Sequence, residues 1–123
     1  MKRKISYVLL CICICVCISC SSFRTKSYKT LAVSGYIYDN AMKSVANLDK
    51  KGLLKPKQKT IIIKYGNQFW LAYNSAIYTM ELYTLSETVE NEVIVTEALN
   101  KVTEYTLLLT DYLVSIGGVI DGN

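Results

Sequence analysis

The five cysteines are the residues of this chain with the most distinctive chemistry, and all lie within the first twenty positions: Cys11, Cys13, Cys15, Cys17 and Cys20. Closely spaced thiolates are typical of zinc and other soft-metal sites. Here every residue between Cys11 and Cys17 that is not cysteine is Ile or Val, and no histidine or acid flanks the run. Because free cysteine behaves as a small hydrophobe, we interpret the run as an apolar segment and predict no metal site.

The segment that holds these cysteines has the layout of an export signal. Three basic residues at 2–4 precede an apolar run over 5–18, and Ser19 stands before Cys20. A basic head, an apolar stretch of about 7 to 15 residues and a small residue before the cut are typical of secretory signal peptides. The ending over residues 17–20 resembles the lipobox of bacterial lipoproteins, although Cys17 stands where a leucine-like residue is usual.

The resemblance implies that residues 1–19 are a cleaved signal peptide and that Cys20 receives a covalent lipid; we expect no other cofactor. It also implies a place in the bacterial cell envelope, with the membrane as partner through the lipid. Cys20 is followed by Ser21 rather than by an Asp. In this the sequence resembles lipoproteins that are sent to the outer membrane in cells with two membranes. An uncleaved anchor is the alternative, but residues 5–18 are shorter than the roughly 20 apolar residues of a spanning helix.

Catalysis is not expected from the side chains that remain. The chain has no histidine, and its only thiol after cleavage would be Cys20. This removes the commonest general base and the cysteine nucleophile. Glu97 and Glu104, two helical turns apart, are the remaining carboxylate pair, and acids on an exposed helix face are ordinarily solvated. We therefore predict no enzyme and no catalytic residue.

About 100 residues remain from Cys20 onwards, which suits one small domain. Apolar residues recur at steps of three and four in three segments, which predicts helices over residues 25–50, 56–85 and 88–116. The stripes are Tyr28, Leu31, Gly35, Tyr38, Met42 and Val45, then Ile62, Tyr65, Phe69, Tyr73, Ala76, Met80 and Tyr83, then Val95, Ala98, Val102, Tyr105, Leu109, Tyr112 and Ile116.

Three such helices cannot bury their stripes singly, so the sequence predicts an all-α fold, an up-down-up antiparallel bundle over residues 25–117. A lipidated linker over 20–24 would precede it, and a tail over 118–123 would follow. Pro56 suits a first helical turn, and Ser86 or Thr88 suits a cap before the third helix. Clusters of β-branched residues at 60–63 and 93–96 leave a strand as the alternative there.

Charge is divided unequally along the chain. After cleavage eleven basic and ten acidic side chains would remain, so overall basicity does not indicate nucleic-acid binding. In the predicted bundle, Arg24, Lys26 and Lys29 would lie beside an anionic membrane, which favours basic residues. The first turn, far from that membrane, carries five lysines that we predict as a contact site for an anionic envelope component or a protein partner, or else as a solvated turn: Lys50, Lys51, Lys55, Lys57 and Lys59.

Aromatic residues offer a second kind of surface. Most of the tyrosines fall on the predicted stripes, where a ring is buried and its hydroxyl reaches the rim. Tyr36, Trp70 and Tyr78 fall off the stripes, so we predict them as possible partner contacts. A tyrosine-lined groove for a glycan or lipid is the alternative function.

The region from 52 to 76 resembles small uncharacterised helical proteins of bacteria and their phages, through Gly52, Leu54, Gln58, Ile62, Gly66, Phe69, Ala72, Tyr73, Asn74 and Ala76. That resemblance implies no known activity. It adds phage-borne lysis and superinfection-blocking lipoproteins as alternative roles. The function we expect is a lipid-anchored envelope protein with a structural or interaction role.

Overall fold

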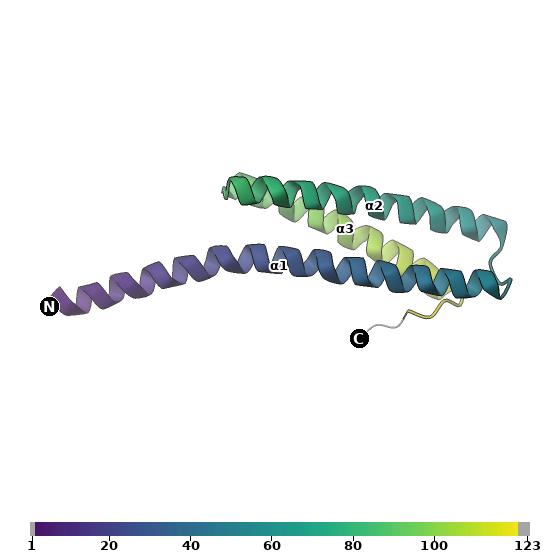
Figure 1. Cartoon of the computed structure of the whole chain (residues 1–123), viewed down its shortest axis with the longest axis horizontal. Helices are drawn as coiled ribbons and strands as arrows, with labels where there is room; N and C mark the ends of the chain where they lie inside the picture. The colour runs from purple at the N-terminus through teal and green to yellow at the C-terminus, as the bar shows by residue number, and fades with distance from the viewer. Residues whose placement is uncertain (1, 121–123) are drawn as a thin grey trace.

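The computed structural model describes residues 2–120 of the backbone and the side chains of residues 23–120. Its three helices are α1 (Lys2–Lys50), α2 (Pro56–Leu85) and α3 (Val89–Ser115). α1 and α3 run in the same direction and α2 runs against them, while α1 continues beyond the α2–α3 turn (Figure 1). The predicted up-down-up helical bundle is confirmed. Residues 60–63 and 93–96 are helical, so the strand alternative is wrong.

Two glycines end α1 and α3 in the same way. Gly52 has a φ of 68° and Gly117 a φ of 90°, which is the left-handed region that favours glycine. Just beyond them, the Leu53 N–H donates to the Leu48 carbonyl at 2.9 Å and the Gly118 N–H donates to the Leu113 carbonyl at 2.8 Å. This Schellman pattern satisfies carbonyls that a helix end otherwise leaves open.

The starts of α2 and α3 are also specified locally. Pro56 opens α2, and the Lys55 backbone N–H donates to Oε1 of Gln58 at 2.8 Å. Thr88 caps α3, because its hydroxyl accepts a hydrogen bond from the Asn91 N–H at 3.2 Å. Thr88 is therefore the side-chain cap among the two residues that the sequence suggested.

The core consists of two clusters along the bundle. One lies toward the α2–α3 turn and is rich in large side chains such as Phe69, Met80 and Tyr83. The other lies toward the α1–α2 turn and is mainly aliphatic, with Ile62 and Leu109 among its members. The ring of Tyr38 on α1 packs against both clusters and so connects them.

The buried face of α1 differs from the predicted stripe by one position. Instead of Tyr28, Gly35 and Met42, the side chains that are buried there are small or aliphatic: Ser27, Leu31, Ser34, Ala41, Ser44 and Leu48. Tyr28 is 48% exposed. Small side chains let two helix backbones approach closely, and the larger residues at the next positions then lie beside the contact.

α3 shows a milder rotation of the same kind. Val95, Val102 and Leu109 are buried as predicted, but Leu99, Thr106 and Leu113 complete the buried line. Tyr105 and Tyr112 are half-buried and pack against the core from the side. α2 buries Ile62, Phe69, Ala76, Met80 and Tyr83 of its predicted stripe.

Candidate functional site

Cys20 is the residue with the clearest predicted role, and the structure does not describe its side chain. The same holds for residues 1–19, the predicted signal peptide. Within the described part of the chain, no helix has a stretch both long and apolar enough to cross a membrane. No group of three or more His, Cys, Asp or Glu side chains able to hold a metal occurs there either.

The end of the bundle nearest residue 20 is closed by an ion pair. Arg24 on α1 pairs with Glu87 in the α2–α3 turn. This contact places the part of α1 around residue 24 beside that turn, as the up-down-up order requires. It also means that Arg24 already has an acidic partner within the protein, whereas Lys26 and Lys29 are exposed.

The opposite end carries the five predicted contact lysines, which we call the lysine end: Lys50, Lys51, Lys55, Lys57 and Lys59. All five are exposed. Among the described residues, only Lys59 of the five has an ion-pair partner, Asp49, at 2.5 Å. The other four positive charges therefore face solvent on either side of one turn, between the end of α1 and the start of α2.

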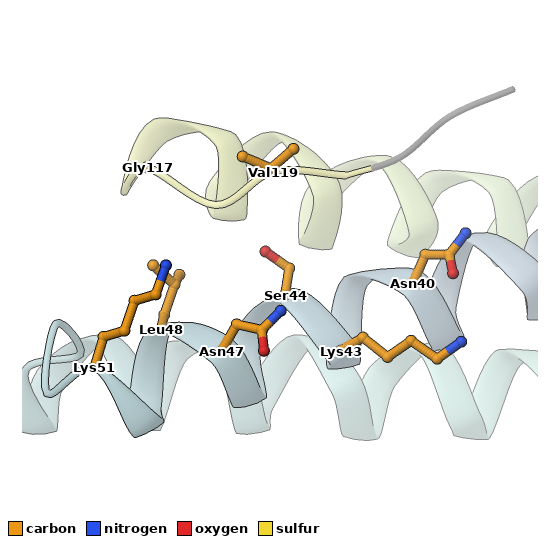
Figure 2. Close-up of a pocket in the computed structure, with 8 residues that line it drawn as sticks. All are labelled: Asn40, Lys43, Ser44, Asn47, Leu48, Lys51, Gly117 and Val119. Atoms are coloured by element: carbon orange, nitrogen blue, oxygen red, sulfur yellow. The ribbon is translucent and has the colours of Figure 1, made fainter.

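A polar pocket of about 210 Å³ adjoins the lysine end, between the last turns of α1 and residues 117–119 (Figure 2). Figure 2 shows Ser44, Leu48 and Lys51 directed from α1 toward the segment that holds Gly117 and Val119. The remaining lining side chains are Asn40, Lys43 and Asn47.

This pocket thus adds a sixth ammonium group, that of Lys43, together with two amides and a hydroxyl, to the lysine end. None of the eight described lining residues is acidic. No motif in the sequence marks this set, although Asn40 and Asn47 lie seven residues apart, close to two helical turns, and so share a side of α1.

The off-stripe aromatics do not form one site with the lysine end. Trp70 Nε1–H donates to the Tyr38 hydroxyl at 3.0 Å, and its ring makes edge contacts with Tyr38, Phe69 and Tyr73. Trp70 therefore belongs to an aromatic cluster of the bundle. Tyr36 and Tyr78 are exposed, but Tyr36 lies fourteen residues from Lys50, or about 21 Å along α1.

Of the two carboxylates Glu97 and Glu104, the structure gives an ion-pair partner to Glu104. Glu104 accepts a hydrogen bond from Lys101 Nζ at 2.7 Å. This hydrogen bond, and the charge of Glu104, raise the pKa of Lys101 above its ordinary 10.5. Glu97 is exposed on the same helix. The arrangement around Glu104 is that of a surface ion pair.

Two further grooves flank α1. The groove toward α2 has a volume of about 290 Å³ and is lined by Tyr38, Met42, Val45 and Ile62 among others. The groove toward α3 is larger, at about 500 Å³, and runs from Lys26 to Ile37. The tyrosine-lined groove that the sequence suggests stays a prediction; Tyr38 lines the first of these grooves, and Tyr105 lines a separate one between α2 and α3.

Comparisons of this chain with family models, with curated proteins and with solved structures find no match. The class that the geometry defines is an elongated three-helix bundle with a strongly basic end.

Proposed function

We propose that this chain is a lipid-anchored protein of the bacterial cell envelope that holds its bundle at Cys20 and presents the lysine end to an anionic partner. The observation that carries the proposal is the placement of the two ends. Arg24 is tied to the α2–α3 turn, and the lysines lie at the other end of the bundle. From Arg24 to Lys50, α1 extends about 39 Å.

An anchor at Cys20 would sit just beyond the Arg24 end, so the lysine end would project from the membrane by about the length of the bundle. Four lysines that have no acidic partner among the described side chains, together with the polar pocket beside them, supply the attraction for anionic groups. Such contacts speed encounter and give specificity, and salt weakens them because exposed charges are screened. The role is one of binding and positioning.

The anchor is tested by metabolic labelling with radioactive palmitate. We expect the wild-type protein to take up label and to fractionate with membranes, and a Cys20→Ala variant to lose the label. Equal labelling of both proteins would overturn the anchor. Membrane retention of Cys20→Ala together with a larger mass would instead support the uncleaved segment.

The contact is tested with a variant in which all five lysines of the lysine end become Gln. We expect binding to envelope fractions to fall at least about tenfold, because several partly screened charge contacts are lost together. A control that removes positive charge elsewhere, Lys64→Gln with Lys101→Gln, should keep most of the binding. Unchanged binding of the five-lysine variant would end the contact proposal and leave the lysine end as a solvated turn.

A further inference from the structure

The groove between α1 and α3 has an apolar floor with positive charge at one end only. Its apolar side chains are Val33 and Ile37 on α1 and Leu107 on α3, and Lys26 and Lys29 stand toward the Arg24 end. None of the nine described lining residues is acidic. Val33 is 48% exposed and Leu107 is 55% exposed, so the floor is open to a ligand.

The threonine hydroxyls of the groove already donate hydrogen bonds within the protein. Thr30 donates its hydroxyl to the Lys26 carbonyl at 3.0 Å, Thr103 to the Leu99 carbonyl at 3.0 Å, and Thr106 to the Val102 carbonyl at 2.7 Å. Each hydroxyl is thus satisfied within its own helix. A ligand that fits this groove therefore needs an apolar part along the floor and a negative charge at one end.

We propose that this groove binds a single-chain lipid with an anionic head group, such as a fatty acid. The head group pairs with Lys26 and Lys29, and the acyl chain lies over Val33, Ile37 and Leu107. From Lys26 to Ile37 the groove runs about 16 Å along α1, a length that suits an extended acyl chain, and its 500 Å³ lies within the usual range of ligand sites. The proposal does not rest on a lipid at Cys20.

The occupant follows from the charge pattern. A partner helix would need complementary charges along its length, whereas the lysines of this groove are confined to one end. A glycan would need hydrogen-bond donors along the floor, and the three threonine hydroxyls there already donate to backbone carbonyls of their own helices. A fatty acid has one charged end and one apolar chain, which matches the groove on both counts.

The test is photolabelling of the full-length chain in neutral phosphatidylcholine vesicles with a diazirine-bearing palmitic acid, followed by mass spectrometry of the adducts. We expect adducts within residues 26–37 and 103–107. The Lys26→Glu, Lys29→Glu double variant should reduce labelling about fivefold, because two exposed charge contacts are reversed. The corresponding fatty alcohol should label less and should not respond to that variant.

A second variant, Val33→Gln with Leu107→Gln, removes the apolar floor at exposed positions, so the fold should be retained. It too should lose labelling, whereas the control Leu85→Gln, at a side chain 84% exposed on α2, should not. Adducts spread over the exposed apolar residues of α2, or labelling indifferent to both groove variants, would overturn the proposal. Labelling that appears only in a Cys20→Ser variant would show that the chain's own lipid fills the groove, and crosslinked dimers through the groove would assign it to a second copy.

Discussion

The pairing of α2 with α3 differs from the attachment of α1 in the size of the side chains that each contact buries. α2 and α3 bring large residues to their contact, among them Phe69, Met80, Val102 and Leu109. The fully buried side chains of α1 are mostly serine and alanine, with Leu31 and Leu48 as the larger ones, while the rings of Phe23 and Tyr38 pack against the core from the side. The α2–α3 contact therefore accounts for most of the buried apolar surface. The attachment of α1 depends instead on close approach of the helix backbones.

This difference explains where the open surface lies. The polar pocket and two of the grooves described above border α1, and lysines of both basic regions line them. A helix attached along a narrow line of small residues leaves space on both sides of that line. We infer that α2 and α3 form the stable part of the bundle and that α1 supplies most of the binding surface.

The largest expected effect is on the α2–α3 contact. Met80 is 1% exposed within the core cluster near the α2–α3 turn, and Met80→Ala should lower the free energy of unfolding by about 2 to 5 kcal/mol, since the cavity would refill only partly. Urea denaturation followed by circular dichroism measures this change. Leu71→Ala, at a site 74% exposed on the same helix, is the control and should stay within about 0.5 kcal/mol of the wild type. Equal losses in both variants would contradict the assignment of Met80 to a tight contact.

The α1 contact should respond to added volume instead. Ala41 is fully buried on α1, so Ala41→Leu should cost about 1 to 3 kcal/mol by forcing the helices apart. Native-state hydrogen exchange should show faster exchange of α1 amides, with less change in α2 and α3. Ala46→Leu, exposed on the same helix, is the matched control. A stabilising Ala41→Leu would mean that α1 is more loosely packed than its small residues indicate.

How much of this could be read from the sequence depends on which signal each residue gives. The α2 stripe was predictable because Ile62, Phe69 and Met80 are apolar and also buried. The buried face of α1 lies one position from the predicted stripe because Ser27 and Ser34 give no apolar signal, whereas Tyr28, next to Ser27, does. The helix ends at Gly52 and Gly117 could be predicted because they depend only on the local sequence.

The candidate sites divide in the same way. The lysine end was predictable, because five lysines around one turn remain together in any helical arrangement. The pocket beside it and the groove between α1 and α3 were not, because both depend on which side of α1 faces α3. The close approach of Gly35 to the ring of Tyr73, whose hydroxyl lies 3.2 Å from where a Cβ would be, could not be predicted either, because it depends on which side of α1 faces α2.

A pair of glycine substitutions separates backbone strain from packing, with smaller effects of opposite sign. Gly66→Ala should stabilise the protein by up to about 1 kcal/mol, because alanine favours a helix interior and the added Cβ would meet the side chain of Tyr38 at ordinary contact distance, its hydroxyl at 3.4 Å and a ring carbon at 4.0 Å. Gly52→Ala should destabilise it by about 1 kcal/mol, because φ at Gly52 is 68°. Thermal unfolding of both variants measures the difference. A destabilising Gly66→Ala would show that the approach of α1 to α2 at Tyr38 is tighter than ordinary contact.

The smallest effect concerns the ion pair of Lys101 and Glu104, which lies outside the buried contacts. Hydrogen bonding to Glu104, and then its charge, raise the pKa of Lys101 above 10.5. A raised pKa means that the pair's contribution to stability is fully present below the unfolded-state pKa, and that it is lost as the pH rises beyond 10.5 through the folded-state pKa. The small difference in urea midpoint between wild type and Glu104→Gln should therefore be constant near neutral pH and vanish at strongly alkaline pH. A difference that persists there would mean that Glu104 acts through packing, and then α3's outer face would also contribute to the stable part of the bundle.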